Sequence, residues 1–71
     1  MTALERLTLP ELLEQEYRLV REIDALKHQV LDMEAQGLTY RVVYQETAQE
    51  LKDSRRDLEA VRAQVRRMRG Y

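Results

Sequence analysis

The chain contains no cysteine, tryptophan or phenylalanine, and it has one proline and two glycines. Without cysteine it can form neither a disulfide framework nor a thiolate zinc site, which agrees with a reducing cytoplasm. No apolar run approaches the roughly 18 residues that a membrane-spanning helix needs, and residues 1–6 lack the order of a signal peptide. We therefore expect one cytoplasmic domain over residues 1–71, with no membrane association.

Groups suited to catalysis or ligand binding are also scarce. No glycine-rich phosphate loop exists, and no serine has a histidine base in reach. The single histidine, His28, has Asp24 and Asp32 four residues away on either side, a spacing that is ordinary for surface charge pairs on a helix. We expect no enzymatic activity, no cofactor, no metal and no small-molecule substrate.

What the chain does have is regular apolar spacing on each side of Gly37. Two ladders of eight positions step by alternating threes and fours, the period that keeps one seam of a helix against a partner helix. The first ladder is Leu9, Leu12, Glu16, Leu19, Ile23, Leu26, Val30 and Met33, and the second is Tyr44, Thr47, Leu51, Ser54, Leu58, Val61, Val65 and Met68. Paired outward from the turn, the residue numbers of every facing pair add to 77. This symmetry predicts an all-α, antiparallel two-helix hairpin of the coiled-coil type.

Local signals mark the start of the first helix. Thr8 and Glu11 have the capping-box spacing, in which each side chain satisfies a backbone N–H at the helix start. Pro10 fits the first helical turn, where its missing N–H costs nothing. Leu7 and Leu12 are spaced as a hydrophobic staple. The first helix should therefore begin at about residue 9.

The turn between the helices is predicted from Gly37 and Thr39. Gly37 can adopt the left-handed conformation that closes a helix, and Thr39 offers a side-chain oxygen to cap the next one. Residues 38–44 are rich in β-branched and aromatic side chains and also fit a strand. We favour a helix because Tyr44 continues the ladder. The expected elements are a helix over about residues 9–36, a turn over 37–39 and a helix over about 40–69.

Three polar residues interrupt the seam. Glu16 falls opposite Val61, where a buried carboxylate is costly unless it is paired. We expect it to bend to the edge of the seam and pair with Arg62, which would help to fix the register; a proton or ligand site is the alternative. Thr47 and Ser54 are small, and we expect their hydroxyls to bond to the preceding helical turn.

Apolar residues outside the seam predict a protein-binding surface. We define the apolar stripe as Leu13, Tyr17 and Val20. The full predicted set of protein-binding residues is Leu13, Tyr17, Val20, Leu31, Val42 and Val43. A core of this size seldom supplies more than about 3 to 5 kcal/mol, so the surface should need cover beyond the stems of Arg55 and Arg62. The simplest cover is a second copy, giving a homodimeric four-helix bundle; a larger protein partner is the other choice.

Charge is unevenly distributed along the chain. Residues 1–38 carry four basic and eight acidic side chains, whereas residues 52–71 carry seven basic and three acidic ones. We expect the acidic side chains of the first helix to compensate the basic side chains of the second. Contact of the basic side chains with nucleic acid or an acidic partner is the alternative. That contact would use the arginine row, which is Arg55, Arg56, Arg62, Arg66, Arg67 and Arg69.

The segment Leu7–Leu13 resembles the Leu-Thr-x-x-Glu-Leu-Leu start of the two-helix ribosomal protein of the large subunit. The resemblance covers seven residues and implies a ribosome-associated role, although the strongly basic balance of that family is missing here. The residues themselves favour a non-enzymatic interaction or assembly module, such as a small adaptor or regulatory subunit. The alternative is a small nucleic-acid-associated or ribosome-associated protein that uses the arginine row.

Overall fold

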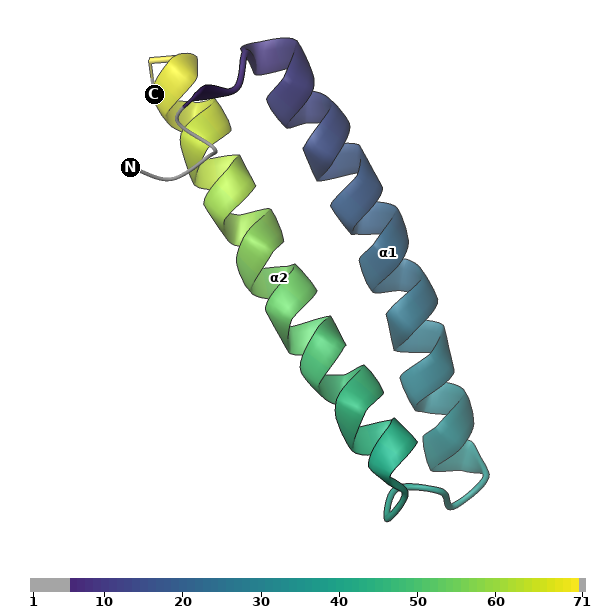
Figure 1. Cartoon of the computed structure of the whole chain (residues 1–71). Coiled ribbons are helices and arrows are strands. Elements are labelled where there is room, and N and C mark those ends of the chain that lie inside the picture. The colour runs from purple at the N-terminus through teal and green to yellow at the C-terminus, as the bar shows by residue number, and fades with distance from the viewer. Residues whose placement is uncertain (1–5, 71) are drawn as a thin grey trace.

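The computed structural model describes residues 6–70, which form two long helices joined by a short connection. Helix α1 spans Leu9–Ala35 and helix α2 spans Val42–Met68. The helices run antiparallel along each other, so residues 6 and 70 lie at the same end of the molecule (Figure 1). This part of the chain is an elongated helical hairpin, measuring 46 × 21 × 17 Å along its principal axes. Neither helix has an apolar stretch long enough to cross a bilayer.

The predicted cap at the start of α1 is confirmed. The Glu11 N–H donates to Thr8 Oγ1 at 3.4 Å, and the Thr8 N–H donates in return to Glu11 Oε1 at 3.0 Å. Pro10 lies in the first turn. The backbone N–H of Thr8, followed by its hydroxyl, stabilises the ionised carboxylate and so lowers the pKa of Glu11 below its usual value.

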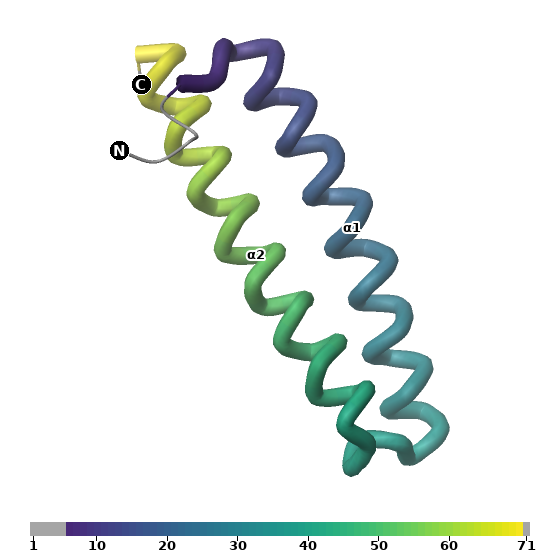
Figure 2. Tube along the Cα trace, in the orientation of Figure 1, coloured from purple at the N-terminus to yellow at the C-terminus, as the bar shows by residue number. Residues whose placement is uncertain are grey.

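The segment before α1 closes the open end of the hairpin. Residues 6–8 turn from the start of α1 toward the end of α2 (Figure 2). Leu7 packs there against the buried cluster of Leu12, Val61 and Val65. The staple predicted between Leu7 and Leu12 is therefore present, and it extends to both helices.

Helix α1 ends with the left-handed glycine that the sequence predicts at position 37. Gly37 has a φ of +72°, in the left-handed region where side chains with a Cβ are disfavoured. The Leu38 N–H donates to the Met33 carbonyl at 2.9 Å, and the Gly37 N–H donates to the Glu34 carbonyl at 3.1 Å. These two bonds form a Schellman motif and satisfy carbonyls at the end of the helix.

The predicted start of α2 is wrong. Arg41, and not Thr39, is the N-cap residue, and no side chain caps this end. The Arg41 carbonyl accepts bonds from the N–H groups of Tyr44 and Gln45 at 3.1 and 3.2 Å. Tyr44 also packs on the core, so packing rather than a capping side chain sets where the helix begins. The strand alternative for residues 38–44 is wrong as well, because they form the connection and the first turn of α2.

Two apolar clusters hold the helices together. The first, near the chain ends, contains Leu12, Val61 and Val65, with Leu9 and Leu19 packed against it. The second, near the turn, contains Leu26, Val30 and Leu51, with Ile23 and Tyr44 packed against it. Leu12 and Val65 belong to the first cluster, and Leu26 and Leu51 belong to the second. The predicted register places both of these pairs in contact across the seam.

The polar positions of the second ladder are also enclosed. Thr47 is buried, and its hydroxyl donates to the Val43 carbonyl at 2.7 Å, one helical turn earlier, as expected. Ser54 is buried in the layer between the two clusters. The small side chain of Ser54 makes the seam thin between the two clusters, whereas Thr47 faces Val30 in the second cluster.

The register can be tested by disulfide crosslinking. Cysteines replacing Leu19 and Leu58 should form a disulfide readily, because the register places these two positions opposite each other. Cysteines at Leu19 and Leu51 should not, since a seven-residue shift moves the second position by about 10 Å along the helix. Non-reducing electrophoresis after mild oxidation measures both. Faster crosslinking of the second pair would contradict this register.

Candidate interaction surface

The apolar stripe lies on the outside of α1. The exposed fractions are 38% for Leu13, 62% for Tyr17 and 42% for Val20. Spacings of four and three residues place all three on one face of the helix. The guanidinium of Arg21 lies 5.7 Å from the centre of the Tyr17 ring, so Arg21 covers part of the stripe. The stripe is still largely open to solvent.

A groove runs beside the seam between the two helices. It is about 420 Å³ in volume, and Ile23 and Leu58 contribute its apolar part. We call it the arginine groove, because most of its other lining residues are basic. Its full lining is Ile23, Arg55, Leu58, Glu59, Arg62 and Arg66.

The apolar stripe and the arginine groove lie on the same side of the hairpin. Leu13 and Val20 each follow a seam residue of α1, at the heptad position that Arg55 and Arg62 occupy in α2. In an antiparallel pair, equivalent flanking positions meet on one side of the seam. The ion pair between Glu16 and Arg62 spans that side. The shared heptad position of the stripe and the arginines is the signal in the sequence that joins them into one surface.

Glu16 behaves as the sequence predicts. Its Oε1 lies 3.7 Å from Nε of Arg62, and its side chain is 30% exposed. The carboxylate therefore reaches the edge of the seam and is not an isolated buried charge. An ion pair this exposed adds little stability, but it occupies Arg62 and leaves the neighbouring arginines for other ligands.

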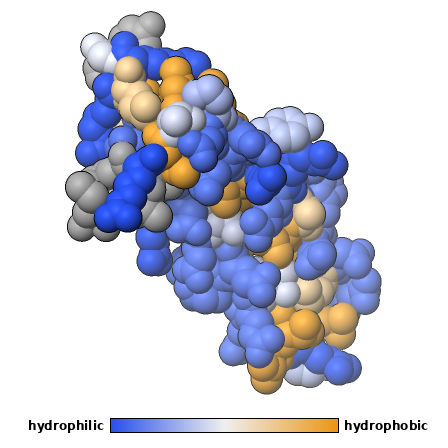
Figure 3. Space-filling view, turned by 45° about the horizontal axis from the view of Figure 1, so that its top comes forward, coloured by the Kyte–Doolittle hydropathy of each residue, from blue (hydrophilic) through white to orange (hydrophobic). Residues whose placement is uncertain are grey.

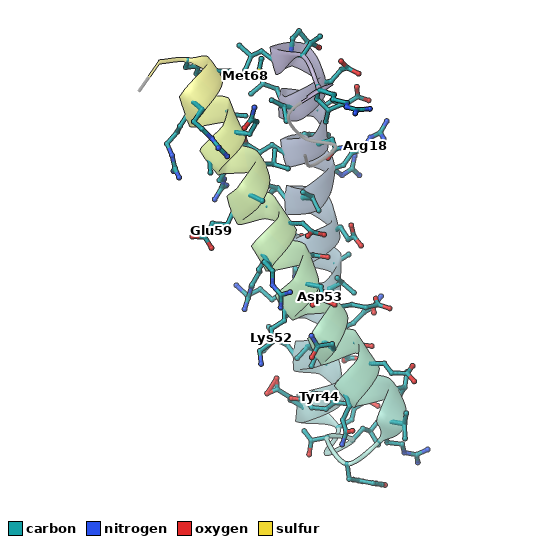
Figure 4. All side chains as sticks on the ribbon, turned by 60° about the vertical axis from the view of Figure 1, so that its left-hand side comes forward. Arg18, Tyr44, Lys52, Asp53, Glu59 and Met68 are labelled. Carbon is teal, nitrogen blue, oxygen red and sulfur yellow. The ribbon has the colours of Figure 1, made fainter. Side chains whose placement is uncertain are left out.

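The opposite side of the hairpin is acidic. Lys52 and Glu59 project from one side of α2, and Arg18 lies on the other side (Figure 4). By heptad position, the arginine-groove side carries six basic and three acidic residues: Lys27, Lys52, Arg55, Arg62, Arg66 and Arg69 against Asp24, Glu34 and Glu59. The other side carries seven acidic and two basic residues: Glu11, Glu22, Asp32, Glu46, Glu50, Asp53 and Asp57 against Arg18 and Arg67. Heptad position thus separates charge between two sides that a count of charges along the chain does not distinguish.

The arginine row does not stay together as one surface. Arg55, Arg62 and Arg66 line the groove. Arg56 instead pairs with Asp53 on its own helix, at 3.7 Å. Arg67 takes a heptad position on the acidic side. The structure therefore divides the predicted row between two sides of the hairpin.

The remaining predicted apolar residues lie nearer the turn. Leu31 is exposed on α1, on the same side as the stripe but beyond it toward the turn. Val42 and Val43 are exposed in the first turn of α2. On the face shown in Figure 3, apolar colour appears in several areas along the long axis, interrupted by hydrophilic residues. These three residues do not extend the stripe into one continuous patch.

His28 shows no arrangement of ligands around it. Its Nδ1 lies 2.7 Å from the Asp24 backbone carbonyl, and both side chains are exposed. Within residues 6–70, no three side chains of the metal-binding types come together. The position of His28 is that of a surface residue bonded to its own helix.

Comparison with known proteins found no matching family model, no matching curated protein and no matching solved structure.

Proposed function

We propose that this chain is a non-enzymatic protein-interaction module, and that the apolar stripe beside the arginine groove is its binding surface. The observation that carries the proposal is the exposure of Leu13, Tyr17 and Val20 in a row on a helix whose other face already forms the seam. Grouped exposed apolar side chains are characteristic of protein-binding sites on soluble proteins. A two-helix hairpin also gains stability from a further helix over its side.

Two kinds of partner could cover this surface. A second copy would complete a homodimeric four-helix bundle by two-fold symmetry. A helix from another protein would make a three-helix arrangement instead. Both forms bury the same stripe, so the proposed function does not depend on which is correct.

The nucleic-acid alternative uses the same side of the hairpin but fits it less well. Arg55, Arg62 and Arg66 do gather in one groove. However, Glu59 lines the same groove, and Glu16 is paired with Arg62 at its edge. These carboxylates would repel a phosphate backbone, whereas a protein ligand can place uncharged or basic groups beside them.

Substitutions in the stripe and in the arginines separate the two functions. Replacing Tyr17 and Val20 by serine should abolish capture of the native partner at any salt concentration, because each large side chain contributes about 1.5 to 3 kcal/mol when buried. Replacing Arg55, Arg66 and Arg69 by glutamine should mainly slow association and weaken its salt dependence. The measurement is affinity capture from the native cell, with and without nuclease.

Tyr40→Ser is the matched control, because it also removes an exposed tyrosine but lies in the connection. It should leave capture unchanged. If the arginine substitutions or nuclease abolish capture while the serine substitutions do not, the chain is a nucleic-acid-binding protein and the proposed function is wrong.

A further inference from the structure

The chemistry of the binding surface indicates the kind of partner it fits. Building on the proposed function, we propose that the surface binds an acidic amphipathic helix from another protein. This helix lies along the arginine groove as a third helix of the bundle. Its apolar side covers the stripe of Leu13, Tyr17 and Val20, and its carboxylates contact Arg55 and Arg66.

The apolar part of the surface has the dimensions of a helix-binding site. From Leu13 to Val20 the stripe extends about 10 Å, or two helical turns. Ile23 and Leu58 continue it into the groove. A helix with apolar residues at spacings of three and four presents a row of matching length, which is the usual way an amphipathic helix occupies a groove.

The charge of the surface requires a negative partner. Arg55 and Arg66 form no ion pair with any residue in the range 6–70, whereas Arg62 is engaged by Glu16. A guanidinium can bind a carboxylate through two parallel hydrogen bonds. Arginines that flank an apolar groove therefore select a helix whose apolar side is bordered by glutamate or aspartate.

A second copy of the chain is a poorer occupant. In a second copy, the stripe is bordered by the same arginines. If the stripes of two copies faced each other, the arginines of one copy would repel those of the other. The acidic side of a second copy has the correct charge, but the large apolar residues that line the groove there, Leu19 and Val61, already pack in the chain's own seam. That second groove is lined by Gln15, Leu19, Asp57, Ala60 and Val61.

The test uses the full chain and two synthetic helical peptides of about 21 residues, or three heptads. Both peptides have leucine at the seam positions, and they differ only in having glutamate or lysine at the flanking positions. Fluorescence anisotropy measures their binding from low to high salt. The glutamate peptide should bind at least about tenfold more tightly at low salt, and the difference should shrink as salt rises.

Charge reversal makes the test specific to the groove. The double variant Arg55→Glu and Arg66→Glu should reverse the preference, so that the lysine peptide binds more tightly. The matched variant Arg56→Glu and Arg67→Glu changes charge equally but outside the groove, and it should keep the preference for glutamate. Replacing Tyr17 and Val20 by serine should weaken both peptides. Circular dichroism shows whether each variant remains helical.

The outcomes distinguish this inference from the proposed function. Equal binding of the two peptides, or an unchanged preference after groove reversal, overturns the acidic-helix inference. The proposed function stands in that case if the serine substitutions still abolish capture of the native partner. A dimer of the free chain that the serine substitutions convert to monomer, without peptide binding, assigns the surface to a second copy and also overturns the inference. Tighter binding of a duplex RNA than of the glutamate peptide overturns both.

Discussion

Leu12→Ala is expected to lower the free energy of unfolding by about 2 to 5 kcal/mol, the range measured for removing a buried leucine side chain. Leu12 is fully buried, and it lies in the cluster that joins the two helices near the chain ends. A chain of this size has only about 3 to 5 kcal/mol from its core, so much of the population should unfold at room temperature. Urea titration followed by circular dichroism measures the loss.

The matched control is Leu13→Ala, which removes the same atoms from the neighbouring residue. Leu13 flanks the seam and is 38% exposed, so its truncation leaves no enclosed cavity between the helices. Its effect on the free energy of unfolding should stay within about 0.5 kcal/mol, as for most surface substitutions. Equal losses for the two variants would mean that the seam does not pass through Leu12.

Gly37→Ala should cost about 1 to 2 kcal/mol, which is the penalty for placing a Cβ in the left-handed conformation. The cost comes from the backbone alone, since a Cβ at Gly37 would meet no atom within 4 Å. To relieve the strain, the chain would have to give up the Schellman bonds that end α1. Thermal unfolding should show a lower midpoint for this variant.

Gly70 provides an internal control for this substitution. It also has a positive φ, +78°, and open space around it. However, it lies outside the turn that joins the two helices, so its backbone can relax without opening the seam. Gly70→Ala should therefore leave the midpoint unchanged. A drop similar to that of Gly37→Ala would show that the cost does not depend on the turn.

The features predicted correctly from the sequence are those fixed by neighbouring residues or by the seam itself. The Thr8–Glu11 cap depends on a three-residue spacing, and it appears as expected. The Glu16–Arg62 pair depends on the seam period, because the period determines which residues of the two helices face each other. The cap spacing and the seam period are both regular spacings of residues, so they can be recognised in the sequence without knowing the fold.

The start of α2 could not be predicted in the same way. A threonine near a turn suggests a cap, but Tyr44 packs on the second cluster, and the N-cap is Arg41, two residues beyond Thr39. The separation of charge follows from heptad position once the antiparallel pairing is known, whereas the groove that gathers three of the arginines is seen only in the fold. Arg66 and Arg67 are adjacent in sequence, but one lies in the groove and the other belongs to the acidic side.

The position of residues 6 and 70 at one end of the hairpin determines how it responds to mechanical force. A pull applied between residues 6 and 70 acts first on the outermost layer, formed by Leu9 and Met68, and then on the layer formed by Leu12 and Val65. The deeper layers carry no load until these have opened. The helices therefore unzip one layer at a time instead of sliding past each other. The thin layer at Ser54 separates the two clusters, so the cluster near the chain ends yields before the cluster near the turn. The hairpin is consequently weak along this direction of pulling, even though its seam runs the whole length of both helices.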